Sequence, residues 1–209
     1  MKKRIYALLF IILSFVALVF IVFALLNIQI KLPLSISYPK NSNYLSWNNE
    51  LNLKQKGNTC GAHATMALLY LYGKGKKDPY QIYESFKKIN NGYVLPFEVV
   101  KYLGNNGIRT TIKLFWLFNN DQKKKWIKSE IEKGKPVIII VGSKNYLHYI
   151  TVIGYNEEVF SVYDSGIPKD FNGDIPGTID INANELINNF NSAEFEGIHI
   201  NAMISGTES

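Results

Sequence analysis

The stretch QKGNTCGAHATMALLYLY, residues Gln55 to Tyr72, contains the only cysteine of the chain, Cys60. Gly57-Asn58 signals a turn, Thr59 is a natural helix N-cap, and a run of helix-forming residues follows. A helix is therefore predicted from near Cys60 to Tyr72. A lone cysteine cannot form an intramolecular disulfide, and the positive end of a helix stabilises a thiolate. The stretch thus presents a candidate nucleophile.

The N-terminal residues have the composition of a membrane anchor. Residues 5–26 carry no charge, and about 20 apolar residues match the ~30 Å hydrocarbon core of a bilayer. Because Lys2, Lys3 and Arg4 come first, we expect residues 1–4 to be cytoplasmic, 5–28 to be a transmembrane signal anchor, and the rest to be extracellular. A cleaved signal peptide, with secretion of the remainder, is the alternative.

The remainder of the chain reads as a tether and one domain. Residues 29–50 are polar and rich in Asn and Ser, which predicts a tether, and residues 51–209 are sufficient for a single domain. The net charge of +6 falls to +3 without the three basic residues at positions 2–4. Such a balance is not a nucleic-acid-binding signature, so no nucleic-acid partner is expected.

Hydrophobic periodicity divides the domain into a helical half and a strand-rich half. Helices are predicted first, at 60–72, 78–89 and 96–104. Strands then predominate, at 108–118, 136–141, 147–155, 159–163, 177–181 and 198–204, with helices at 120–133 and 184–190 between them. Helices followed by a mostly antiparallel sheet indicate an α+β fold.

Two residues of the strand-rich half can complete a catalytic site with Cys60. His148 begins one predicted strand, and Asp164 follows the end of the next. If these strands form a hairpin, their ends meet, and a carboxylate can orient an imidazole that acts as general base. Gln55, five residues before Cys60, could donate its amide to an oxyanion, together with the Cys60 backbone N–H.

Each of these residues also has a structural interpretation. A lone cysteine is often a small core residue, a strand histidine is often structural, and an Asp before Ser-Gly often forms a turn. His63, one helical turn after Cys60, is interpreted as structural. A metal site built on Cys60 and His63 is conceivable, although zinc sites show more ligands at tighter spacing. We therefore expect neither a metal nor a cofactor.

Three blocks together resemble the papain-like cysteine peptidases, and in particular the bacteriocin-processing, double-glycine leader peptidases and their stand-alone relatives. The blocks are QKGNTCGA at 55–62, HYITVIGY at 148–155 and VYDS at 162–165. The resemblance spans residues 51–204. It implies a papain-like fold with Cys60 as nucleophile, His148 as base, Asp164 as orienting acid and Gln55 as oxyanion donor.

The chain also departs from that pattern. Ser165 follows Asp164 where those relatives usually have proline, and Ala62-His63 follows Cys60-Gly61 where they often have a small pair. The departures remove no catalytic group, but they weaken the inference of a Gly-Gly leader substrate. We expect a membrane-anchored extracellular cysteine peptidase acting on a peptide or protein. The alternatives are a papain-like acyltransferase or amidase, and a non-catalytic surface binding protein with a relict site.

Overall fold

The computed structural model describes residue 14 and residues 42–143, 146–167, 178–196 and 198–208. The chain divides into two compact units, 1–37 and 38–209, and all described residues except Ser14 belong to the second. The expected cytoplasmic tip and anchor, and the tether up to residue 41, lie outside the described residues apart from Ser14. In the described part of the chain, no helix is both long and apolar enough to cross a membrane.

A seven-stranded sheet forms the centre of the second unit. Its strands follow the order β4-β11-β5-β6-β7-β8, with β1 attached to β6, and every pair is antiparallel. The strands are β1 (Ser42–Tyr44), β4 (Ile108–Leu114), β5 (Val137–Ser143), β6 (Tyr146–Asn156), β7 (Val159–Tyr163), β8 (Thr178–Asn182) and β11 (Ala202–Glu208). The mostly antiparallel sheet expected from the sequence is confirmed.

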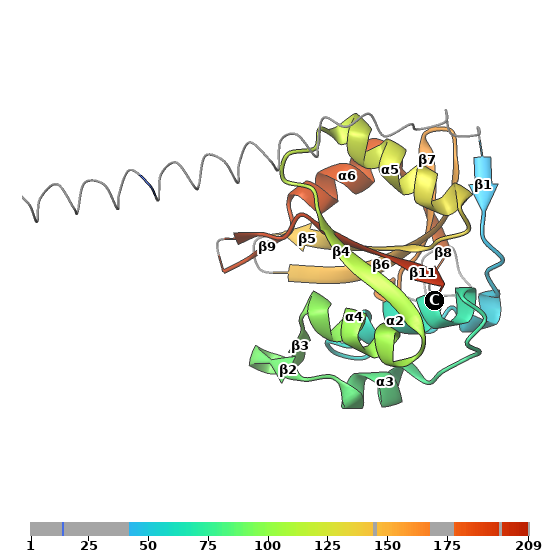
Figure 1. Cartoon of the computed structure of the whole chain (residues 1–209), viewed down its shortest axis with the longest axis vertical. Helices are drawn as coiled ribbons and strands as arrows, with labels where there is room; N and C mark the ends of the chain where they lie inside the picture. The colour runs from blue at the N-terminus through green and yellow to red at the C-terminus, as the bar shows by residue number, and fades with distance from the viewer. Residues whose placement is uncertain (1–13, 15–41, 144–145, 168–177, 197, 209) are drawn as a thin grey trace, which may run out of the picture. The chain divides into compact units, whose positions relative to one another are not determined.

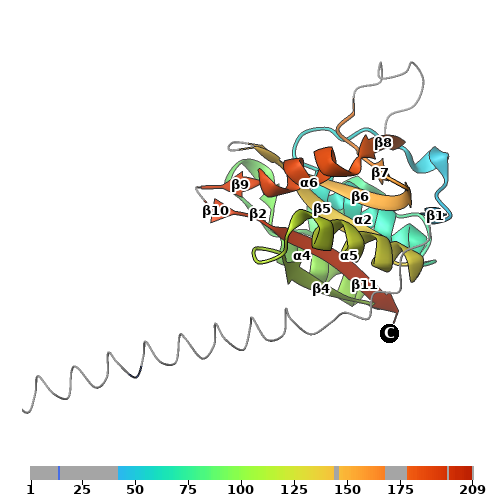
Figure 2. The ribbon, with the colours of Figure 1, turned by 90° about the horizontal axis from the view of Figure 1, so that it is seen from above.

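Helices cover both faces of this sheet (Figures 1 and 2). One face carries α2 (Cys60–Leu71), α3 (Pro79–Ser85) and α4 (Pro96–Asn105), and the other carries α5 (Asn120–Glu132) and α6 (Ala183–Asn191). Two hydrophobic cores result, one on each side of the sheet. Helix α2 is buried from Cys60 to Leu69, as expected of a helix that is apolar on all sides.

Two short hairpins extend the fold beyond the main sheet. β2 (Lys88–Ile89) and β3 (Tyr93–Val94) are joined by the 3-10 turn η2 (Asn90–Gly92), and β9 (Glu194–Phe195) pairs with β10 (Ile198–His199). The helix predicted over 78–89 is therefore too long. It ends at Ser85, because Phe86 has an extended backbone and residues 88–89 pair with β3.

The strands of the second half are close to their predicted positions, with two differences. The strand predicted over 108–118 ends at Leu114, and Phe115 packs in the core under α5 and α6. The strand predicted over 198–204 consists of two strands, β10 and β11, which pair with different partners.

The folded domain includes residues that the sequence assigns to the tether. β1 pairs with the end of β6, and Tyr44 lies against Gly154. Trp47 contacts the rings of Tyr70 and Tyr163, and its indole N–H donates to Asn52 at 2.8 Å. The 3-10 turn η1 (Asn49–Leu51) then leads into the stretch that contains Cys60.

Candidate active site

Cys60 is the first residue of α2 and is 8% exposed. Thr59 occupies the N-cap position, as predicted, but its hydroxyl donates to the Lys56 carbonyl at 3.1 Å and does not cap the helix. The first N–H groups of a helix have no intrahelical partner, so the Cys60 N–H remains available as a donor. The uncapped helix start also presents its partial positive charge to the thiol.

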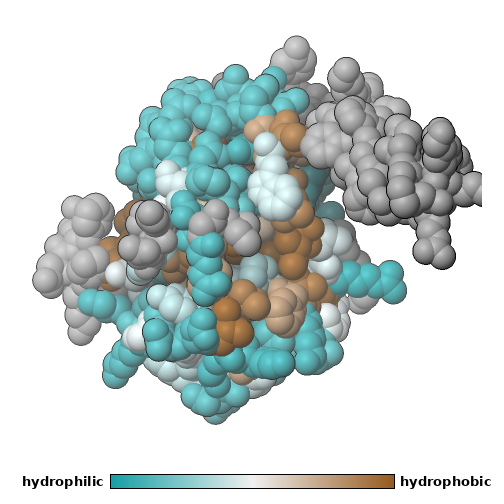
Figure 3. Space-filling view, turned by 90° about the vertical axis from the view of Figure 1, so that its left-hand side faces the viewer, coloured by the Kyte–Doolittle hydropathy of each residue, from teal (hydrophilic) through white to brown (hydrophobic). Residues whose placement is uncertain are grey.

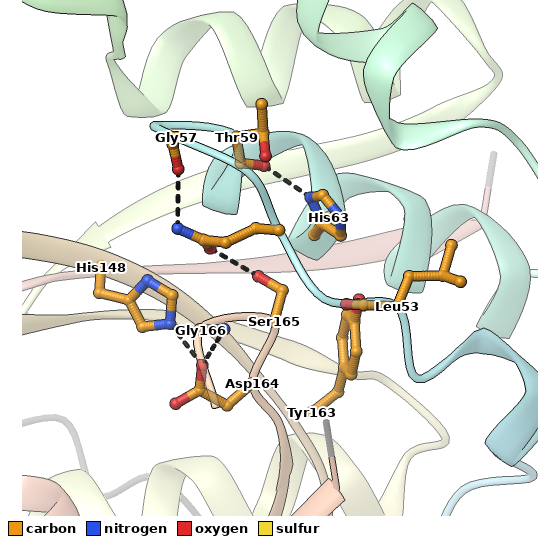
Figure 4. Close-up of polar contacts among 10 residues, drawn as sticks. Leu53, Gly57, Thr59, His63, His148, Tyr163, Asp164, Ser165 and Gly166 are labelled. Carbon is orange, nitrogen blue, oxygen red and sulfur yellow. Dashed lines mark hydrogen bonds and ion pairs between the residues drawn. The ribbon is translucent and has the colours of Figure 1, made fainter. Parts of the chain in front are cut away.

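The β6–β7 hairpin brings His148 and Asp164 together, as Figure 4 shows. His148 Nε2 lies 2.5 Å from Asp164 Oδ1, and the His148 side chain is almost fully buried. The Gly166 N–H donates to the same carboxylate oxygen at 2.7 Å. The carboxylate is thus fixed from two sides and holds the imidazole in one orientation.

His148 is held in its protonated form by its neighbours. Burial lowers the pKa of the imidazole, but the interactions of the ring with Asp164 and Cys60 outweigh burial and raise it to about 10. The other ring nitrogen, Nδ1, is buried and has no hydrogen-bond partner among the described residues. A proton on Nδ1 is therefore available for transfer, and Cys60 is close enough to the ring to interact with it electrostatically.

Gln55 lies against the loop that follows β7. Its backbone N–H donates to the Ser165 carbonyl at 2.8 Å, and its side-chain Oε1 accepts from the Ser165 hydroxyl at 2.8 Å. Its side-chain Nε2 donates to the Gly57 carbonyl at 3.0 Å. The same loop, residues 164–166, therefore contacts both His148 and Gln55.

Three residues of this site were missed by the interpretation of the sequence. Gly166 packs closely on the His–Asp pair, because a Cβ there would meet His148 Nε2 at 3.1 Å and Asp164 Oδ1 at 3.2 Å. Ser165 was noted only as a departure from a motif. Tyr146 stacks on His148 with ring centroids 5.8 Å apart and an interplanar angle of 20°. None of these contacts has a local sequence signature.

One hollow of the surface lies beside Cys60 and another beside His148. An apolar cavity of about 40 Å³ lies beside Cys60 and is lined mainly by Val94, Leu95, Ile140, Leu147, Tyr149 and Phe195. An open groove of about 390 Å³ lies on the side of Tyr146, His148 and Asp164. Tyr93 and Phe195, from the two short hairpins, make an edge-to-face contact with centroids 6.3 Å apart.

His63 is placed as a structural residue. It is fully buried, its Nδ1 lies 2.9 Å from the Thr59 carbonyl, and its ring packs edge-on against Tyr80. Burial lowers the pKa of His63, which keeps the ring neutral. Within the described ranges, no group of three or more His, Cys, Asp or Glu side chains could hold a metal ion.

Comparison with known proteins relates this chain to others through its fold. No protein-family model and no curated protein sequence matches it. Among solved structures, it is similar to a double glycine motif protease from an AMS/PCAT transporter in complex with the leader peptide. The two share 15% identity, with 75% of this chain and 89% of that chain covered and a TM-score of 0.52.

Two further solved structures are similar. A C39-like peptidase from Bacillus anthracis shares 12% identity over 81% of this chain and 99% of its own, with a TM-score of 0.54. A recombinant stem bromelain precursor shares 12% identity over 85% of this chain and 73% of its own, with a TM-score of 0.55. The fold expected from the three sequence blocks is therefore confirmed: the chain has the papain-like cysteine peptidase fold, in the form also seen in C39-like peptidases.

Proposed function

We propose that this protein is a cysteine peptidase that uses Cys60, His148 and Asp164 as a catalytic triad and Gln55 as an oxyanion donor. One observation supports the proposal above the others. His148 is bonded through Nε2 to Asp164, its Nδ1 accepts or donates no hydrogen bond among the described residues, and the ring interacts with a thiol at the uncapped start of a helix. If Cys60 were only a small residue of the hydrophobic core, this arrangement would have no explanation.

The proposed reaction has two steps, acylation and deacylation. The Cys60 thiolate attacks the carbonyl carbon of the scissile peptide bond, and the resulting oxyanion accepts from the Cys60 N–H and the Gln55 amide. The C–N bond breaks as His148 gives its proton to the leaving amine, which leaves a thioester. Water, deprotonated by His148, attacks this thioester, and the acid product leaves as the thiolate forms again.

The surroundings of Cys60 suit a peptide with small or apolar residues near the cleavage point. The cavity beside Cys60 has an apolar lining and is far smaller than an engineered cavity of ~150 Å³ that binds benzene. It therefore admits a group of methyl size without rearrangement. Figure 3 views the side that carries β2, β3 and β9 in Figure 1, and shows a hydrophobic band between hydrophilic surfaces.

A leader-like peptide is the first substrate class to test, because a similar solved structure contains a leader peptide. The test is to incubate the full-length protein with a library of peptides and to identify new termini by mass spectrometry. Cleavage with a shared small-residue pattern, abolished by Cys60→Ala, supports the proposal. The same cleavage products from the unmodified protein and from Cys60→Ala would contradict it. Adding an amine nucleophile separates hydrolysis from acyl transfer, since a transferase would give the amide.

We further propose that residues 5–28 anchor the protein in a membrane with the catalytic domain outside the cell. The uncharged stretch and the basic residues before it support this orientation. Because Cys60 is the only cysteine, a small membrane-impermeant thiol reagent applied to intact cells reports its side of the membrane. Modification of Cys60 without permeabilisation is expected. Modification only after permeabilisation would contradict the proposed orientation.

A further inference from the structure

Ser165 connects the His148–Asp164 pair of the proposed catalytic site with Gln55. It is 2% exposed and lies between Asp164, which binds His148, and Gly166, which donates to Asp164. Its hydroxyl and its carbonyl both bond to Gln55, at 2.8 Å each. These two contacts join positions 110 residues apart in the chain.

The bonds to Gln55 define which way its amide faces. The Gly57 carbonyl can only accept a hydrogen bond, so the atom of Gln55 that faces it at 3.0 Å must be the nitrogen. The amide oxygen therefore faces Ser165, whose hydroxyl must donate. Gly57 adopts a left-handed backbone, with φ of 63°, which suits a glycine and directs this turn. One N–H of the Gln55 amide is left for another acceptor.

We propose that Ser165 is a positioning residue that holds the Gln55 amide with its remaining N–H available to the oxyanion. This role rests on the proposed peptidase function, in which Cys60 forms an acyl-enzyme through an oxyanion. An alanine at position 165 leaves Oε1 without its donor, so the amide can rotate and its N–H loses a fixed direction. In the unmodified protein, the loop 164–166 thus orients two catalytic groups: Asp164 orients the imidazole of His148, and Ser165 orients the amide of Gln55.

The test uses the full-length protein and p-nitrophenyl acetate, a small activated ester that acylates thiols through an oxyanion. Ser165→Ala is expected to lower the rate of the p-nitrophenolate burst about tenfold, the worth of one well-placed hydrogen bond. Ser165→Thr, which keeps the hydroxyl, is expected to restore most of the rate. Ser205→Ala is the matched control, since Ser205 of β11 is also buried and its hydroxyl donates to Glu130 of α5 at 2.7 Å, with no contact to Gln55 or Asp164 among the described residues.

Two comparisons separate positioning from a merely structural effect. Alkylation by iodoacetamide forms no oxyanion, so its rate is expected to be unchanged in Ser165→Ala. In a Gln55→Ala background, Ser165→Ala is expected to cause no further loss, because the two residues act as one unit. A burst rate equal to that of the unmodified protein, or two losses that multiply, would overturn the proposal.

The failure of the proposed function gives a different result. If the unmodified protein shows no p-nitrophenolate burst, the proposed acylation of Cys60 is contradicted. The position of the amide is then judged by the side-chain NH₂ signals of Gln55 in a ¹⁵N NMR spectrum. These signals are expected to move in Ser165→Ala and to stay in place in Ser205→Ala. Signals that stay in place in both variants would overturn the positioning role itself.

Discussion

Asp164 determines the state of His148, and this has a measurable consequence for pH dependence. The proposed acylation needs a proton on His148, whose pKa is about 10. The rate of hydrolysis is therefore expected to stay level across neutral pH and to fall as the pH approaches 10. Asp164→Asn removes the charge that raises this pKa, so the alkaline fall should move to lower pH. An unchanged profile in Asp164→Asn would contradict the assigned role.

The same pair makes stability depend on pH. The pKa of His148 in the folded protein lies above its ordinary value of 6.5, so the folded state binds the proton more tightly. The stabilising contribution is fully present below pH 6.5 and is lost as the pH rises toward 10. Denaturant unfolding at pH 6 and pH 10 is expected to show a smaller free energy of unfolding at the higher pH. This difference should shrink in Asp164→Asn.

Gly166 gives a test of how closely the site is packed. A Cβ at this position would lie 3.1 Å from the His148 ring, so in Gly166→Ala the His–Asp pair must shift by a few tenths of an ångström. We expect a loss of about 1–2 kcal/mol in the free energy of unfolding, typical of overpacking, together with a loss of activity. Gly104→Ala in α4 is the control, since a Cβ there meets nothing within 4 Å and alanine favours the helix. Equal effects of the two changes would contradict this account.

At the scale of elements, β1 supports the strand that carries His148. A Cβ on Gly154 of β6 would clash with the Tyr44 ring of β1, so Gly154→Ala must displace that ring. Tyr44 is 55% exposed and can move outward, so we expect a cost of about 1 kcal/mol in unfolding free energy. In a Tyr44→Ala background this cost should disappear. A cost that persists there would show that another contact of Gly154 is responsible.

The elements themselves could largely be predicted from the sequence, because their signals are local. The run of helix-forming residues in α2, the Asp78-Pro79 start of α3 and the continuous apolar run of β5 are each signals between neighbouring residues. The ends of elements were less accurate where a tertiary contact decided them. Helix α3 ends earlier than predicted because Phe86 is extended and buried, and β4 ends before Phe115 because that side chain packs in the core.

At the scale of the whole molecule, the order of Cys60, His148 and Asp164 and their positions at element ends suggested the site. The contacts that complete it join distant segments, as Ser165 does with Gln55, or depend on close approach, as Gly166 does with His148. Such contacts follow from how the layers dock, and a single sequence carries no local signal for them. The pairing of residues 42–44 with β6 could not be predicted for the same reason.

The central claim is that Cys60 and His148 form a reactive pair, and the reaction of Cys60 with iodoacetamide at pH 6 tests it most directly. Cys60 is expected to react much faster than free cysteine, because it lies at the start of a helix and beside the His148 imidazole. His148→Ala should reduce the rate to that of an ordinary thiol. A Cys60 that reacts no faster than free cysteine, and is indifferent to His148→Ala, would contradict the account.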